Sequence, residues 1–202
     1  WEFSMTEAFE ISGIPSEGGV LLVVDHASSH IPDDIDLGIS AQHQQDHIAF
    51  DPGIAPIARL MTRASGYLAI LSTASRLIVD LNRYPDEAAV IVESSDGVEI
   101  PGNRISEEEK QARLDRFFTP YHDRVGKLIA DLKPALVASL HSFSPVLRSN
   151  PQLKRPWDMG IMYNDYTAAP RLAIQFLEAE GVIKVGDQMP YSGKDLNATM
   201  NR

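Results

Sequence analysis

Three segments of the sequence carry side chains that can bind a metal ion or a carboxylate, and each follows a short apolar run. They are Asp25-His26, Asp80-Leu81-Asn82-Arg83 and His141-Ser142. A neutral imidazole is a good zinc ligand, and the guanidinium fork of an arginine matches a carboxylate. Sites in open α/β sheets form beyond the carboxyl ends of the strands, so we expect His26, His141 and Arg83 to share one site.

Each of these residues also has a structural interpretation. A histidine at a strand end is often a hydrogen-bonded structural residue, and the residues alone leave both interpretations open for His26 and His141. Asn82-Arg83 could equally be a turn with a surface salt bridge. His30 is a weaker candidate, because its segment runs into Pro32, which favours an extended loop over a helix.

A second set of chemically able side chains recurs at four-residue intervals, at His43, His47 and Asp51. One helix would place all three on one face, where a solvated polar stripe is the simplest interpretation. Asp51 stands directly before Pro52-Gly53, a helix break at which a side chain can point into a cleft. We therefore rank Asp51 above the two histidines as a functional candidate.

The composition restricts the class of protein. A length of 202 residues suits one domain, and 44% hydrophobic with 23% charged residues is ordinary for a globular protein. The absence of cysteine excludes disulfides and thiolate metal sites, which leaves His, Asp and Glu as the strong ligands. A formal charge of −10 argues against nucleic acid as a partner. No phosphate loop, dinucleotide fingerprint or Gly-x-Ser-x-Gly elbow is present.

Neither a membrane span nor a secretory signal is expected. The longest aliphatic run, residues 20–24, is far shorter than the ~20 residues that cross a bilayer. The N-terminus lacks the basic and apolar regions of a secretory signal, so we expect a cytoplasmic protein. Met5 is a candidate natural start, which would make residues 1–4 an appended scar.

Apolar runs and amphipathic segments predict the elements that position these side chains. Strands are expected at residues 20–25, 67–71, 77–81, 135–140 and 160–163, with a hairpin of 90–92 and 98–100. Helices are expected over 40–64 with a break at Pro52-Gly53, over 106–132 with a kink near Pro120, and over 170–180. This order predicts an α/β fold with a mixed, largely parallel sheet and helices on both faces.

The motifs resemble those of the N-formylglutamate amidohydrolase family, zinc-dependent enzymes with a fold similar to that of the zinc carboxypeptidases. The matching segments lie in order along nearly the whole chain, at residues 24–32, 47–53, 78–83, 139–143, 155–160 and 190–193. The resemblance implies a single hydrolase domain over residues 1–202 with a zinc-exopeptidase-like fold. It also implies a metal-dependent enzyme that cleaves N-formyl-L-glutamate, or a related N-acyl amino acid, into formate or another acid and the amino acid.

The resemblance implies that His26 and His141 bind one zinc ion. The carboxypeptidase pattern has a glutamate three residues after the first histidine, where this chain has Ser29, so a third ligand must come from elsewhere. Asp51 is our candidate for that ligand, and its alternative role is that of the catalytic base.

The resemblance further places Asn82 and Arg83 against the carboxylate of the substrate, where Arg83 would also align the scissile amide for catalysis. Ser142 and Arg155 are additional candidates for substrate binding. Family members run past the position of Arg202 into a strand with an acidic residue, the analogue of the carboxypeptidase base. A C-terminal part of the domain would then lie outside this sequence.

Two other interpretations stay open. The same residues would serve a zinc deacylase or carboxypeptidase-like enzyme with another substrate, and they would also occur in a small-molecule-binding relative that has lost catalysis. Zinc content measured together with turnover separates these interpretations. The sequence does not indicate an oligomeric state.

Overall fold

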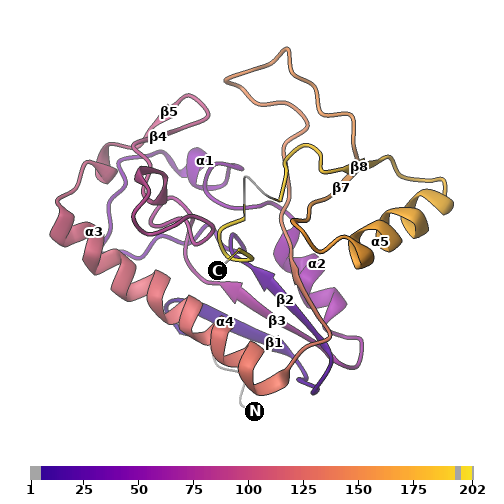
Figure 1. The fold of residues 1–202 in the computed structure, drawn as a ribbon. Helices are drawn as coiled ribbons and strands as arrows, with labels where there is room; N and C mark the ends of the chain where they lie inside the picture. The colour runs from indigo at the N-terminus through magenta and orange to yellow at the C-terminus, as the bar shows by residue number, and fades with distance from the viewer. Residues whose placement is uncertain (1–5, 194–196, 202) are drawn as a thin grey trace. The chain divides into compact units, whose positions relative to one another are not determined.

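The computed structural model describes residues 6–193 and 197–201. The chain divides into two compact units, residues 1–143 and residues 144–202. The central sheet and the long helical segment belong to the first unit, and a smaller sheet with one helix belongs to the second (Figure 1). The prediction of one hydrolase domain over the whole chain stays a prediction.

The first unit is built on a mixed four-stranded sheet with the strand order β1-β3-β2-β6. Its strands are β1 (Phe9–Gly13), β2 (Val20–Val24), β3 (Tyr67–Ser72) and β6 (Leu136–Ser139). Strand β2 is parallel to β3 and to β6, whereas β1 is antiparallel to β3. Because β2 and β6 are parallel neighbours, the residues that follow them emerge at the same edge of the sheet.

Strand β2 is covered on both faces. Leu21 and Val23 belong to one apolar cluster, and Leu22 and Val24 belong to another. Successive side chains of a strand point to opposite faces, so a strand buried on both sides needs an apolar residue at every position. This requirement explains the unbroken aliphatic run of the sequence.

Helices cover each of the two clusters. Helix α2 (Ile54–Met61) buries Ile54, Ala55 and Ala58 against one cluster. On the other cluster lies a continuous helical segment made of α3 (Glu107–Arg113), a π-helical turn η3 (Leu114–Phe118) and α4 (Thr119–Leu132). A mixed α/β fold with helices on both faces of the sheet is thereby confirmed.

The long helical segment begins where the capping box predicts. The Ser106 hydroxyl oxygen accepts a hydrogen bond from the Glu109 backbone N–H at 3.2 Å. The irregularity expected near Pro120 is the π-helical turn η3, which ends directly before α4. Proline has no N–H to donate and clashes with the carbonyl four residues earlier, so a regular α-helix cannot run through this position.

The strand predicted over residues 77–81 is wrong. This segment is buried, but its backbone forms a turn and a loop contact and no strand: Ile78 N–H donates to the Ser75 carbonyl oxygen at 3.0 Å, and Asp80 N–H donates to the Val90 carbonyl oxygen at 2.7 Å. A short apolar run indicates burial and does not by itself indicate strand pairing. Arg83 therefore lies in a loop and not at a strand end.

Other boundaries differ from the prediction as well. Helix α1 (Ala41–Gln44) is a single turn, so His43, His47 and Asp51 do not share a helix face. A hairpin turns at Asp96-Gly97 as predicted, with β4 (Ser94–Ser95) antiparallel to β5 (Val98–Glu99), but residues 90–92, the predicted first strand, form no strand. Two short 3₁₀ turns flank it, η1 (Ala88–Val90) and η2 (Pro101–Asn103). Strand β6, predicted over residues 135–140, is partly exposed because it lies at the edge of the sheet.

The second unit holds a parallel pair of strands, β7 (Met159–Ile161) and β8 (Val185–Asp187), and the helix α5 (Ala168–Ala179). The predicted strand at 160–163 and helix at 170–180 both exist with shifted bounds. Gly181 follows α5 with a φ of +67°, a left-handed conformation that glycine adopts without strain. Among the described residues of the chain, no helix is long and apolar enough to cross a membrane.

Candidate active site

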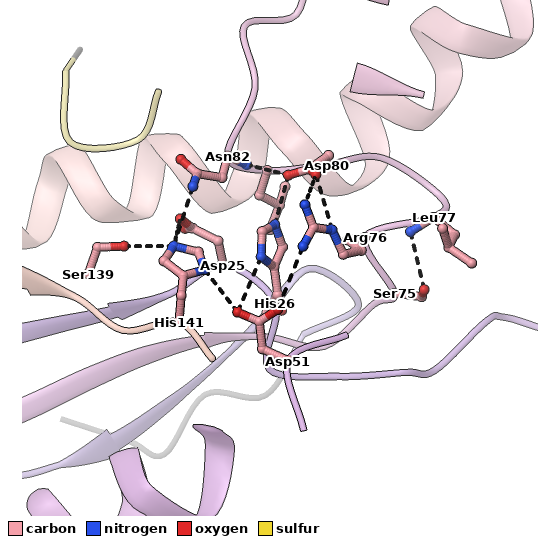
Figure 2. Close-up of polar contacts among 12 residues, drawn as sticks. Asp25, His26, Asp51, Ser75, Arg76, Leu77, Asp80, Asn82, Ser139 and His141 are labelled. Carbon is pink, nitrogen blue, oxygen red and sulfur yellow. Dashed lines mark hydrogen bonds and ion pairs between the residues drawn. The ribbon is translucent and has the colours of Figure 1, made fainter. Parts of the chain in front are cut away.

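Three side chains that are distant in sequence converge in the first unit: His26, Asp51 and His141 (Figure 2). Each offers one atom that can bind a metal, and these atoms all lie within 4.8 Å of one another. The imidazole rings of His26 and His141 have centroids 4.9 Å apart. His26 and His141 therefore lie close together, as predicted. Asp51 contributes the carboxylate of the same cluster.

The backbone explains this convergence. His26 lies two residues after the end of β2, and His141 lies two residues after the end of β6, its parallel neighbour. The Asp51 backbone N–H donates to the His26 carbonyl oxygen at 2.9 Å, which joins the loop before α2 to the end of β2. Gly53 is the N-cap of α2 and has a φ of +85°.

His26 is buried and is oriented by a carboxylate. Its Nε2 lies 2.7 Å from Oδ1 of Asp80, and in the neutral tautomer that carries its proton on Nε2 the ring has its lone pair on Nδ1. That Nδ1 finds no hydrogen-bond partner among the residues that the structure describes. It lies 3.6 Å from Oδ2 of Asp51. A buried nitrogen lone pair beside a carboxylate oxygen is suited to a cation bound by both.

Asp51 directs one oxygen toward the histidines. Its Oδ2 lies 3.0 Å from Nδ1 of His141 and accepts the backbone N–H of Ser142 at 3.0 Å. Burial by itself would raise the pKa of the Asp51 carboxyl, but His141 and His26 outweigh it and hold that pKa well below its usual range. Asp51 is therefore ionised at neutral pH.

His141 is surrounded by groups that hold its second nitrogen. Its Nε2 lies 3.0 Å from Oγ of Ser139, 3.3 Å from Nδ2 of Asn82 and 3.6 Å from Oδ2 of Asp25. Burial lowers the pKa of His141, but the attraction of Asp25 and Asp51 is stronger and raises it to about 9. In the metal-free protein His141 is therefore protonated at neutral pH.

Two acidic residues that sequence reasoning did not assign to the site support the histidines from outside. Asp25 is buried next to His141, and its Oδ1 accepts the hydroxyl of Tyr121 at 2.9 Å. Burial raises the pKa of Asp25, but interactions with His141, His26 and Tyr121 lower it on balance. Asp80 supports His26 in a similar way, because its Oδ1 lies 2.7 Å from Nε2 of that ring.

Asp25 and Asp80 both lie inside the matched segments of the sequence, but the sequence did not indicate that they contact the two histidines. Arg76 gave no signal, because nothing in its neighbourhood of the sequence relates it to a site. Its side chain nevertheless donates to Oδ2 of Asp80 from Nε at 3.2 Å and from Nη2 at 2.6 Å.

The predicted substrate-binding residues of the first unit lie close to this cluster in different ways. Asn82 reaches His141 with its side-chain amide, and its backbone N–H donates to Oδ1 of Asp80 at 2.9 Å. Arg83 is half-buried, and its backbone N–H donates to the Asp80 carbonyl oxygen at 3.2 Å. Ser142 contributes its backbone N–H to Asp51. Their contacts with a substrate stay predictions.

Arg155 belongs to the second unit. There its Nη1 donates to the Ser144 carbonyl oxygen at 3.1 Å, and its guanidinium carbon lies 4.9 Å from the centroid of the Tyr191 ring. The role of Arg155 in substrate binding also stays a prediction.

The other histidines considered in the sequence are not part of the cluster. His30 lies exposed in an extended loop, as Pro32 predicts. His43 lies in the single turn of α1. The ring nitrogens of His47 lie 2.5 Å from Oδ1 of Asp46 and 3.0 Å from Oδ2 of Asp96.

The fold is similar to two solved structures. A gene product of Agrobacterium tumefaciens matches with a TM-score of 0.83 and 33% sequence identity, over 96% of this chain and 79% of that chain. An N-formylglutamate amidohydrolase from Ralstonia eutropha matches with a TM-score of 0.69 and 16% identity, over 94% of this chain and 79% of that chain. A search of curated proteins found no significant match.

A family model agrees with the motifs and with the geometry. The model described as N-formylglutamate amidohydrolase matches residues 18–202, which include His26, Asp51 and His141. The match covers far more than half of the chain, and it spans all the segments on which the resemblance rests. The chain therefore belongs to the N-formylglutamate amidohydrolase family.

Proposed function

We propose that this protein is a zinc-dependent amidohydrolase that cleaves N-formyl-L-glutamate, or a related N-acyl amino acid, into formate or another acid and the free amino acid. Membership of the family supports an amide-cleaving activity. The observation that supports the metal is the buried Nδ1 of His26, which lacks a hydrogen-bond partner among the described residues and faces Asp51. We also propose the zinc-exopeptidase-like fold that the resemblance implies.

The donor set fits zinc. Two imidazole nitrogens and one carboxylate oxygen are a common ligand set in catalytic zinc sites, where a fourth position stays open for water or substrate. The carboxylates of Asp80 and Asp25 stand behind the two histidines, and such partners fix the orientation of a metal-binding ring. Asp51 supplies the carboxylate that Ser29 cannot supply.

We assign Asp51 to metal binding and not to proton transfer. A zinc ion at this site would polarise the amide carbonyl and acidify a water molecule. The geometry supports this assignment, because Oδ2 of Asp51 lies 3.6 Å from Nδ1 of His26 and 3.0 Å from Nδ1 of His141. One ion could therefore contact Asp51 together with both histidines.

Asn82 and Arg83 are the proposed anchor for the carboxylate of the substrate. The Asn82 amide lies 3.3 Å from Nε2 of His141, and the Arg83 backbone N–H donates to the carbonyl oxygen of Asp80, the residue that orients His26. The planar guanidinium of Arg83 can bind a carboxylate through two parallel hydrogen bonds. Binding energy spent there would position the scissile amide at the metal.

Zinc analysis of the purified protein, combined with a formate-release assay across N-formyl amino acids, tests this proposal. We expect one zinc ion per chain and the highest kcat/KM for N-formyl-L-glutamate. Full zinc occupancy without turnover of any N-acyl amino acid would instead support a binding protein. A protein that releases formate with no metal bound would contradict the metal-dependent mechanism.

A further inference from the structure

The side chain of Arg76 lies between two carboxylates of the proposed metal site (Figure 2). It donates two hydrogen bonds to Oδ2 of Asp80, at 3.2 and 2.6 Å. Its third nitrogen, Nη1, lies 3.6 Å from Oδ1 of Asp51, which is the distance of an ion pair. One guanidinium therefore contacts the ligand Asp51 and also Asp80, the carboxylate that orients His26.

Each carboxylate divides its two oxygens between Arg76 and the rest of the site. In Asp80, Oδ2 faces Arg76 and Oδ1 lies 2.7 Å from Nε2 of His26. In Asp51, Oδ1 faces Arg76 and Oδ2 lies 3.0 Å from Nδ1 of His141. Arg76 thus engages the outer oxygen of both groups and leaves the inner oxygens to the histidines.

The net charge of the site also involves Arg76. Asp25, Asp51 and Asp80 are three buried carboxylates around the two histidines. A divalent cation at the cluster would balance two of the three negative charges, and Arg76 would balance the third. Buried charges are tolerated only when they are paired in this way.

We propose that Arg76 is a positioning residue for the metal: it keeps Asp51 as a ligand through one oxygen and keeps Asp80 as the hydrogen-bond partner of His26. This inference rests on the proposed function, because it concerns the same zinc site. Arg76 acts through the two aspartates and not on the substrate.

Charge and geometry make opposite predictions for the loss of Arg76. By Coulomb's law alone, removal of a positive charge near the ligands would strengthen the binding of a cation. Loss of positioning would weaken it, since loss of an outer partner of a metal ligand typically costs about 10- to 100-fold in metal affinity or activity. The affinity of the metal-free chain for zinc therefore distinguishes the two effects without an activity assay.

The experiment compares Arg76→Met and Arg76→Lys with the unaltered chain, in competition with a chromophoric zinc chelator. We expect Arg76→Met to weaken zinc binding by about 10- to 100-fold. Arg76→Lys keeps the charge but loses the planar fork, so it should also bind zinc more weakly. The absorption spectrum of bound Co²⁺ should change in both variants, because it reports the coordination of the metal.

Arg59→Met is the matched control. Arg59 also forms a two-nitrogen contact with a carboxylate, to Glu10 at 3.1 and 2.7 Å, but Glu10 belongs to β1 and is not a member of the metal-binding cluster. Zinc affinity should be unchanged in this variant. Circular dichroism of the metal-free proteins checks folding, and if Arg76→Met does not fold, the affinity and the Co²⁺ spectrum of Arg76→Lys decide the question.

The outcomes separate this inference from the proposed function. If the unaltered chain binds no zinc, the proposed function fails and the role of Arg76 fails with it. If the unaltered chain binds zinc but Arg76→Lys binds it equally well with the same Co²⁺ spectrum, only the positioning role is overturned. Zinc binding by Arg76→Met that is as tight as in the unaltered chain, or tighter, would also overturn it.

Discussion

His26 and His47 each lie next to two aspartates, but the two arrangements differ in what they can bind. Both ring nitrogens of His47 are engaged by carboxylates, at 2.5 and 3.0 Å. His26 engages Asp80 with one nitrogen, and its other nitrogen has no hydrogen-bond partner among the described residues. A metal needs lone pairs that converge on one point, so contact between histidine and aspartate is not by itself a metal site.

The position of each histidine in the fold explains the difference. His26 follows a strand whose parallel neighbour leads to His141, so the fold brings a second imidazole to the same place. His47 lies in the loop after α1, where Asp96 of the β4-β5 turn approaches its second nitrogen. One carboxylate contacts Nδ1 and the other contacts Nε2, so each ring nitrogen of His47 already has a partner.

The largest expected effect is loss of the metal when one of its ligands is removed. His26→Ala and His141→Ala should each lower zinc affinity by more than about 100-fold, beyond the usual cost of losing an outer partner. His47→Ala should retain one zinc ion per chain. Elemental analysis after dialysis measures both, and zinc loss in His47→Ala with retention in His26→Ala would reverse our comparison.

The second prediction compares the aspartates of the two clusters. Asp51→Asn should reduce zinc affinity by about 10- to 100-fold, because a charged ligand becomes a neutral amide. Asp46→Asn should leave it unchanged. Chelator competition measures the affinities, and steady-state kinetics at saturating zinc add the second criterion. A variant with normal zinc affinity and a low kcat would identify Asp51 as the base.

The third prediction extends the comparison to the substrate. Arg83→Lys should lower kcat/KM for N-formyl-L-glutamate by about 10- to 100-fold, since hydrogen bonds between charged groups contribute about 1.5–3 kcal/mol. Arg104→Lys is the control near the β4-β5 hairpin, where Arg104 pairs with Glu99 on the surface. It should have no effect.

A substrate with an amidated α-carboxylate adds a test of what Arg83 recognises. The unaltered enzyme should lose activity on this substrate, while Arg83→Ala should discriminate far less between the two substrates. If Arg83→Ala keeps the original preference, Arg83 is not the anchor, and Arg155 becomes the next candidate.

A further prediction, which needs no substitution, is a pH dependence specific to the His26 and His141 cluster. The pKa of His141 is raised to about 9 in the metal-free protein, so a metal must displace a proton there below that pH. Apparent zinc affinity should rise roughly tenfold per pH unit between pH 7 and 8 and level off above about 9. Calorimetry in two buffers of different ionisation enthalpy should detect about one released proton, and no release would contradict the raised pKa.

The same proton affects the stability of the metal-free protein. The folded pKa of His141 is raised above its ordinary value of 6.5, so its stabilising contribution is fully present below that value. The contribution is lost as the pH rises through about 9. Thermal melts of the metal-free chain between pH 6 and 10 should show this loss, and His141→Ala should not show it.

Sequence reasoning identified the parts of the site that depend on regular structure. His26 follows an aliphatic run that only a doubly covered strand explains, and His141 follows a second short apolar run. Parallel pairing then predicts that both meet at one edge of the sheet. Asp51 was a candidate because it precedes a helix break, and α2 does begin just after it.

Contacts between loops were beyond this reasoning. Tyr121 and Asp25 are separated by 96 positions, and their hydrogen bond depends on how the long helical segment packs on the sheet. Arg76 contacts Asp51 through a loop with no periodic pattern. The apolar run at residues 77–81 was mistaken for a strand, because its turn and its loop contact depend on partners such as Ser75 and Val90.

The sequence by itself determined the available metal ligands, because a chain without cysteine offers histidine and acidic residues. It also determined that β2 is buried on both faces and that a helix starts after Ser106, since burial patterns and capping boxes are local. Only the tertiary structure decided that one ring nitrogen of His26 is left without a hydrogen-bond partner among the described residues, while both ring nitrogens of His47 contact carboxylates. That difference depends on distances of a few ångströms between loops, and no local pattern encodes them.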